Sequence, residues 1–308
     1  MADLTVELGS LTLKNPVMTA SGTFGYGKDY VDFFPLGELG AVVVKGVAPF
    51  PSHGNPTPRV AEVSGGMLNA IGLQGPGVDK FLHHEDYMPF LRKSGAVTIV
   101  NIWGRTIEDY AEVAARIDAE SEGIAALEVN ISCPNVKEGG ASFGGDPELS
   151  KEVVAATRSA TTLPLIVKLS PIPGRVAEFA EAVVSVGADM ISLINTIPAM
   201  AIDTDTWKPK IANVKGGLSG PAIKPVAVGM VYDVARAVDV PVIGMGGVFT
   251  GLDAVEFLLA GASAVAVGTA IFADPMAPVK VIRELNDYLD ERGIADVAEI
   301  IGKVDLGG

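Results

Sequence analysis

The feature that most restricts the fold of this chain is a series of eight short, almost continuously apolar runs rich in β-branched residues. Strands that are apolar on both faces are typical of a parallel sheet covered by helices. Amphipathic helical patterns separate most of the runs, so the 308 residues predict an α/β fold, a (β/α)8 TIM barrel, with a doubly wound open sheet as the alternative. The runs are Pro16–Ala20, Ala41–Lys45, Val97–Asn101, Ala125–Asn130, Leu165–Leu169, Met190–Ile194, Val242–Met245 and Ala264–Val267.

The segments outside these runs define the rest of the organisation. Residues 4–13 alternate between apolar and polar around Gly9-Ser10, which predicts an N-terminal β-hairpin. Residues 45–79 and 195–221 are too long for simple strand-to-helix connections and are rich in Gly and Pro. We expect them to form long active-site loops. No change of composition resembles a linker, so we expect a single domain over residues 1–308.

Composition excludes several classes of protein. Asp plus Glu outnumber Lys plus Arg by 37 to 23, and the net charge of −14 disfavours nucleic acid and anionic membranes as partners. Cys133 is the single cysteine, so an intrachain disulfide is impossible, and three scattered histidines give no zinc signature. The first residues lack the basic and apolar segments of a signal peptide, so we expect a cytoplasmic protein without a metal site.

Polar residues stand at the ends of the predicted strands. Catalytic groups of a TIM barrel lie at the carboxyl ends of its strands, although a single polar residue there can simply reach solvent. Two lysines and three asparagines at equivalent positions favour a site. Lys168 stands out because it lies within an apolar run, and a buried ammonium needs a partner or a function. The strand-end residues are Ser21, Lys45, Asn101, Asn130, Lys168 and Asn195.

Glycine-containing pairs follow the last two runs, at Gly246-Gly247 and Gly268-Thr269. TIM barrels commonly bind phosphate at these positions, on backbone N–H groups and a helix N-terminus. A dinucleotide would instead favour an early G-x-G-x-x-G motif with an acidic residue about 20 positions later, and the chain lacks this combination. The two pairs therefore predict a phosphorylated cofactor such as flavin mononucleotide (FMN).

Cys133 lies just after the fourth run, within residues 130–135 (NISCPN). A lone cysteine is more often a small buried apolar residue than a catalyst. Here the neighbours are polar, Pro134 opposes continuation of a helix, and glycine pairs follow at 139–140 and 144–145. This context indicates a mobile loop that carries a reactive side chain over the barrel mouth.

The joint order of several motifs resembles the dihydroorotate dehydrogenase family over nearly the whole chain. The resemblance implies an FMN-containing barrel that oxidises dihydroorotate to orotate in pyrimidine biosynthesis. A cysteine base resembles class 1 of this family, whereas class 2 uses serine and a membrane-associated N-terminal extension. The motifs are residues 15–22, 69–73, 130–135, 194–196 and 217–221, followed by the two glycine-containing pairs.

Residues 69–74 and 216–225 look most like class 1B. That class implies NAD+ as final acceptor, a partner subunit that carries FAD and a 2Fe–2S cluster, and a homodimer core within a heterotetramer. This chain cannot hold the cluster itself, which needs about four thiolates. Gly75 departs from the pattern, because asparagine is expected there. The alternatives are a fumarate-linked class 1A enzyme, a dihydropyrimidine dehydrogenase-like barrel that leaves Lys45 unexplained, and a barrel that serves only as a scaffold.

The resemblance also implies a role for each site residue. Cys133 would take the proton from C5 of dihydroorotate while hydride leaves C6 for the flavin. Lys45 would pair with the substrate carboxylate, and Lys168 would stabilise negative charge on the reduced flavin. The other substrate ligands would be Asn69, Ala70, Ile71, Gly72, Leu73, Asn130, Asn195 and Thr196. The flavin would contact Ser21, Lys45, Gly46, Asn101, Asn130, Ile194 and Gly220, with its phosphate on Gly246, Gly247, Gly268 and Thr269.

Overall fold

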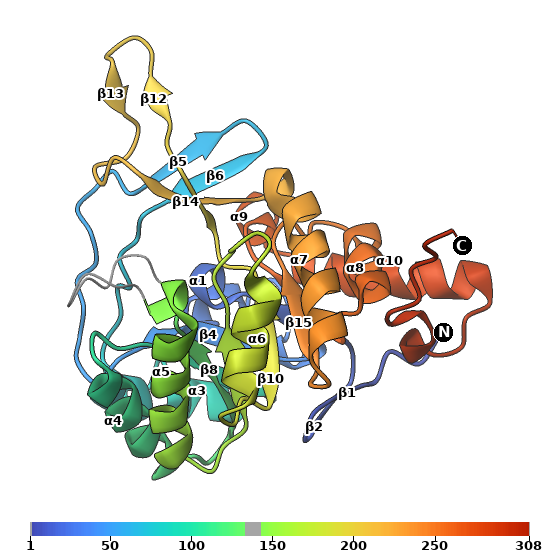
Figure 1. Cartoon of the computed structure of the whole chain (residues 1–308), viewed down its shortest axis with the longest axis horizontal. Coiled ribbons are helices and arrows are strands. Elements are labelled where there is room, and N and C mark those ends of the chain that lie inside the picture. Colours follow the sequence, from blue (N-terminus) through green and yellow to red (C-terminus); the bar gives the residue numbers. More distant parts are fainter. Residues whose placement is uncertain (1, 133–142, 308) are drawn as a thin grey trace.

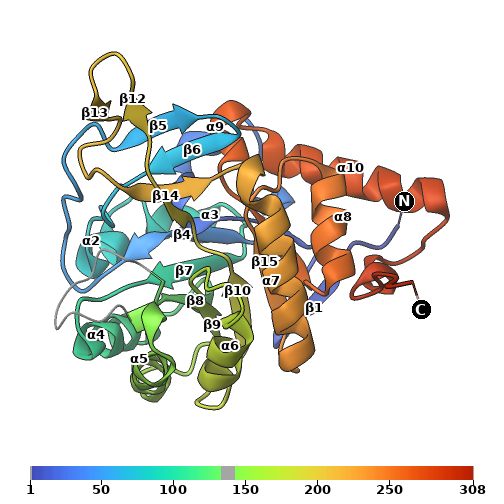
Figure 2. The ribbon, with the colours of Figure 1, turned by 45° about the horizontal axis from the view of Figure 1, so that its top comes forward.

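The computed structural model describes residues 2–132 and 143–307. Its centre is an eight-stranded parallel sheet in the order β3-β16-β15-β10-β9-β8-β7-β4 (Figures 1 and 2). A parallel bridge between Met18 and Ala41 joins the two end strands, so the predicted TIM barrel is confirmed. The strands are β3 (Val17–Thr19), β4 (Val42–Val47), β7 (Thr98–Ile102), β8 (Ile124–Asn130), β9 (Leu165–Lys168), β10 (Met190–Leu193), β15 (Val242–Met245) and β16 (Ala264–Val267).

The barrel interior is built in layers two residues apart along each strand. An apolar layer includes Ile99, Ala126, Ile166 and Met190, all fully or almost fully buried in one interior cluster. Side chains alternate along a strand, so the residues two positions further on face the same way. These residues form a buried polar layer next to the strand ends, and they are Asn101, Glu128, Lys168 and Ser192.

Helices cover the outer face of the barrel (Figure 1). Thr106 and Asp109 form a capping box at the start of α4, and Asp146 caps α5 ahead of Pro147. Buried apolar residues such as Val113 and Val153 pack in the same core cluster as the outward-facing strand residues. The helices are α1 (Ser21–Phe24), α2 (Val78–His83), α3 (Met88–Lys93), α4 (Ile107–Asp118), α5 (Pro147–Ser159), α6 (Val176–Val184), α7 (Lys224–Ala237), α8 (Gly251–Ala260), α9 (Ala270–Ala273) and α10 (Ala277–Arg292).

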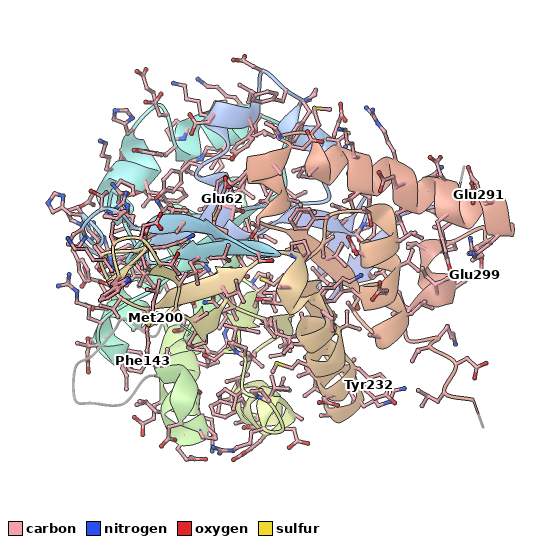
Figure 3. The ribbon with its side chains drawn as sticks, turned by 90° about the horizontal axis from the view of Figure 1, so that it is seen from above. Glu62, Phe143, Met200, Tyr232, Glu291 and Glu299 are labelled. Atoms are coloured by element: carbon pink, nitrogen blue, oxygen red, sulfur yellow. The ribbon has the colours of Figure 1, made fainter. Side chains whose placement is uncertain are left out.

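The two long segments expected to be loops instead form a second, four-stranded antiparallel sheet. Its order is β11 (Ile197–Ala199), β14 (Gly216–Ser219), β6 (Gly66–Asn69) and β5 (Val60–Val63). Figure 2 shows this sheet beside the barrel, and Figure 3, seen from above, places Glu62 of β5 over the centre of the molecule. A small hairpin of β12 (Ile202–Asp203) and β13 (Lys208–Pro209) projects from it (Figure 1).

Glycine makes these strands resemble loops in the sequence. A Cβ on Gly216 would lie 2.5 Å from the Asn69 carbonyl oxygen, and one on Gly217 would lie 1.8 Å from Thr196 Oγ1. Both positions therefore require glycine for close approach within the sheet, whereas glycine in a sequence is typical of turns. The two long segments line a cavity as predicted, and the strands within them are an addition, because backbone pairing of distant segments leaves no local signal.

The N-terminal hairpin is confirmed, since β1 (Val6–Leu8) pairs with β2 (Leu11–Leu13) across Gly9, whose φ is +64°. Short 3-10 helices complete the structure: η1 (Lys28–Tyr30), η2 (Leu36–Glu38), η3 (Phe143–Gly145), η4 (Pro221–Ile223) and η5 (Val297–Ile300). Across the described part of the chain, none of the helices has the length and apolarity needed to cross a membrane.

Candidate active site

A cavity of about 600 Å³ opens at the carboxyl ends of the barrel strands, beside the four-stranded sheet. Its size falls within the range of about 300–1,000 Å³ that small-molecule and cofactor sites occupy. Side chains and backbone from both sheets line it, so the site lies between the barrel and the segments that cross it. The lining includes these predicted residues: Lys45, Asn69, Ile71, Lys168, Ile194, Asn195, Thr196, Gly220, Gly246, Gly247, Gly268 and Thr269.

Seven other predicted residues do not line the cavity. Ser21 accepts a contact from Lys168 Nζ at 3.5 Å, and Asn101 donates from Nδ2 to Glu128 Oε2 at 2.5 Å. A Cβ on Gly46 would lie 2.8 Å from Trp103 Cδ1, so the backbone there is closely packed. Ala70, Gly72 and Leu73 follow β6, and Asn130 ends β8.

The cavity holds two cationic side chains at one end. Lys45 on β4 was predicted, and Arg59, just before β5, was not. Burial lowers the pKa of the Lys45 ammonium below its ordinary value, and the nearby positive charge of Arg59 lowers it further. A buried ammonium beside a second positive charge is suited to an anionic group, which would relieve both the desolvation of Lys45 and the repulsion.

Arg59 is held in place by its own hydrogen bonds. Its Nη2 donates to Gln74 Oε1 at 2.5 Å, and Nη1 donates to the Asn55 carbonyl at 3.3 Å. The sequence offered one signal for Arg59: it is a basic residue within the long segment 45–79, which was expected at the active site. Sequence spacing alone does not show which residue of that segment reaches the cavity.

A chain of hydrogen bonds leads from the cavity lining to Ser132 and Asn130. Asn195 Nδ2 donates to Ser132 Oγ at 2.6 Å, and Ser132 Oγ donates to Asn130 Oδ1 at 2.9 Å. The Thr196 amide donates to Asn195 Oδ1 at 2.7 Å, which orients the side-chain amide of Asn195. Cys133 is the next residue in the chain after Ser132, and it lies outside the described residues.

Glycine builds the opposite end of the cavity. Gly220, Gly246 and Gly247 have φ values of +103°, +120° and +88°, a conformation that other residues rarely adopt. A Cβ on Gly247 would lie 2.7 Å from Lys224 Cβ and 3.0 Å from the Gly220 carbonyl oxygen. The backbone can therefore approach a ligand closely here, as a phosphate cradle requires, and the residues present fit FMN.

Lys168 lines the cavity from the end of β9. Its side chain is 6% exposed, and its contact with Ser21 Oγ, at 3.5 Å, is too long for a strong hydrogen bond. The ammonium therefore retains donors for a ligand in the cavity. A buried cation beside a cavity also favours negative charge on whatever occupies it.

A TIM barrel with glycine-rich backbone after its last strands, and with two lysines that line the cavity from other strands, belongs to a class of barrels suited to phosphorylated cofactors and anionic substrates. The sequence profile of dihydroorotate dehydrogenase matches residues 3–289. The chain belongs to the dihydroorotate dehydrogenase family.

Similar proteins agree on the branch of the family. The dihydroorotate dehydrogenase B (NAD(+)) catalytic subunit of Geotalea uraniireducens is 56% identical over 300 residues, 97% of each chain. The protein of the same name from Geobacter sulfurreducens is 55% identical over 304 residues, 99% of each chain. A solved structure, dihydroorotate dehydrogenase from Eimeria tenella in complex with ferulenol, has a TM-score of 0.80 and 26% identity. The match covers 98% of this chain and 88% of the Eimeria tenella chain.

Proposed function

We propose that this protein oxidises (S)-dihydroorotate to orotate in pyrimidine biosynthesis, as the FMN-bearing catalytic subunit of an NAD+-linked dihydroorotate dehydrogenase. The cavity carries the proposal, because it joins a cationic end, amide side chains and a glycine cradle at the strand ends. The names of the most similar relatives support the NAD+-linked form over the fumarate-linked one.

The cationic end matches the substrate carboxylate. Lys45 would pair with it, and Arg59 adds a second positive charge within the same lining. The ring amides would bind the side chains of Asn69, Asn195 and Thr196, of which Asn195 is already oriented by its hydrogen bonds. Buried polar groups of this kind reject ligands that cannot satisfy them. Asn130 and the backbone of residues 70–73 would complete the substrate site.

The reaction removes hydrogen from two carbon atoms and forms the C5=C6 double bond. Cys133, as thiolate, would take the C5 proton, and the C6 hydrogen would leave with the bonding electron pair. Bound FMN supplies the acceptor for that hydride. Because the thiolate and not the thiol is the base, turnover would depend on the ionised form of the cysteine. Lys168 would offset the negative charge that accumulates in the cavity.

The remaining cavity residues would hold the cofactor. Gly246, Gly247, Gly268 and Thr269 would bind the phosphate, and the Thr269 hydroxyl already donates to Ser219 Oγ at 2.8 Å. Ser21, Gly46, Asn101, Ile194 and Gly220 would contact the flavin ring system. These assignments follow the resemblance of the motifs, and the closeness of most of these residues to the cavity supports them.

The proposed assembly follows from the relatives named as catalytic subunits. A partner subunit would carry FAD and a 2Fe–2S cluster and pass electrons to NAD+, with two copies of this chain at the core of a heterotetramer. We further propose that residues 1–308 act as one domain in the cytoplasm. Each chain would bind one FMN.

Spectroscopy of the purified chain tests the proposal. We expect a yellow protein whose flavin absorbance is bleached by dihydroorotate without air. NAD+ should be reduced only after an iron–sulfur flavoprotein partner is added, whereas turnover with fumarate by the chain alone would indicate class 1A. A colourless protein that binds no FMN would contradict the proposal and leave the scaffold alternative.

A further inference from the structure

A buried carboxylate lies beneath the candidate site and has no part in the chemistry described above. Glu128 is near the centre of β8, is 2% exposed and belongs to the polar layer of the barrel interior. An ionised carboxylate removed from water costs several kcal/mol unless hydrogen bonds or charges compensate. Branched apolar residues usually fill this part of a TIM barrel, so an acid here calls for a specific role.

Side chains from two other strands satisfy this carboxylate. Asn101 Nδ2, on β7, donates to Oε2 at 2.5 Å, and Ser192 Oγ, on β10, donates to Oε1 at 2.9 Å. A carboxylate accepts hydrogen bonds and cannot donate them, so it determines which end of the Asn101 amide faces it. The nitrogen turns toward Glu128, and Oδ1 remains as an acceptor near Gly46, whose Cβ, if present, would lie 2.9 Å from it.

The position of Asn101 connects this arrangement to the cavity. Strand β7 lies between β4 and β8, and β9 follows β8. Lys45, two residues before the end of β4, and Lys168, at the end of β9, both line the cavity. Asn101 therefore lies one strand from Lys45 and two strands from Lys168 along the barrel wall, although it does not itself line the cavity. Its Oδ1, which is not bonded to Glu128, would be the acceptor for an N–H group of a flavin bound against this wall.

We propose that Glu128 is a positioning residue that holds the Asn101 amide as an acceptor for the flavin and lowers the reduction potential of the bound flavin. The inference rests on the proposed function, since it takes the cavity to hold FMN. Reduction adds electron density to the ring. A buried negative charge, and an amide oxygen made more electron-rich by donating to it, both disfavour that addition. Lys168, a cation of the same layer, acts in the opposite sense.

Substitution Glu128→Gln tests the proposal with little change in shape. The new side chain can still accept from Asn101 through Oε1 while its Nε2 donates to Ser192 Oγ, so the charge is what changes. We expect the ratio of the FMN dissociation constants, oxidised over reduced, to rise tenfold or more. For a two-electron couple this is a potential higher by about 30 mV, measured by equilibration with a redox dye.

Ser192→Ala provides the matched control. It removes the second hydrogen bond to Glu128 from a residue just as buried, yet keeps the charge and the contact with Asn101. Its flavin potential should equal that of the wild type. A role in packing alone would weaken the binding of both redox forms equally and leave the potential of both variants unchanged.

The outcomes separate the inference from the proposed function. If the wild-type chain binds no FMN, the proposed function fails. If the wild type binds FMN and Glu128→Gln has an unchanged potential, the inference alone is overturned. Should that variant not fold, Glu128→Asp keeps the charge but withdraws it from Asn101 by one methylene. We then expect a smaller rise in potential, and the wild-type value there would overturn the inference equally.

Discussion

Replacing Lys45 with methionine tests the substrate end of the cavity. Methionine keeps most of the apolar stem and removes the ammonium, so the change in shape is small. Lys45 lines the cavity on β4 together with Arg59. Removing one partner of a buried charge pair typically costs about 2–5 kcal/mol, because the other charge is left without compensation.

Arg59 determines where in this range the effect should fall. Its charge contributes to the lowered pKa of Lys45, so it acts at the same end of the cavity. The guanidinium remains in the variant and keeps part of the attraction for the substrate carboxylate, while the repulsion between the two cations disappears. We therefore expect a loss of about 2 kcal/mol, which is roughly a 30-fold weaker binding of orotate.

Ligand titrations followed by flavin absorbance measure this loss. Orotate carries the carboxylate and uracil has the same ring without it, so uracil binding should stay nearly unchanged in Lys45→Met. Lys14→Met, at an exposed position, serves as the control. Equal losses for both ligands, or orotate binding at the wild-type strength, would refute the pairing of Lys45 with the carboxylate. Orotate binding at the wild-type strength would also favour the alternative of a dihydropyrimidine dehydrogenase-like enzyme, whose substrate lacks the carboxylate.

Three further predictions concern the base, the flavin and pH. Cys133→Ala should keep bound FMN and lose most turnover, and near wild-type flavin reduction by dihydroorotate in stopped flow would contradict its role. Lys168→Ala should lower the flavin potential because a buried cation favours added electrons, and an unchanged potential would remove that argument. Orotate affinity, measured by calorimetry, should fall as pH rises through the lowered pKa of Lys45, since the neutral amine no longer attracts the carboxylate. The fall should begin below the ordinary lysine pKa of 10.5 and be absent in Lys45→Met.

The barrel could be predicted from the sequence because its strands are buried on both faces. The bounds of β15 and β16 coincide with the predicted runs, and the other barrel strands differ from their runs by at most two residues at either end. Strand-end residues such as Lys168 and Asn195 could be identified in the same way, since the carboxyl ends of parallel strands meet at one rim.

Pairing between distant segments could not be predicted. Residues of β14 are mostly glycine and serine, and they form a strand because β6 and β11 provide its partners. Arg59 reaches the cavity from beside this second sheet, so its place in the cavity could not be predicted either. Glu128 is an acid within an apolar run, but it stands two positions before the last residue of the run, and catalytic groups are expected at that last position.

The two-residue period of the strands explains how the barrel can be both stable and polar at its mouth. Outward residues such as Leu127 and Val129 pack on helices, whereas Ala126, Glu128 and Asn130 face the interior in successive layers. A shift by one residue would turn these polar groups toward the apolar helix layer, where they would lack partners. The apolar pattern that sets the register of β8 therefore also sets which polar groups face the barrel mouth, and the proposed chemistry of the site depends on the same residues that close the barrel.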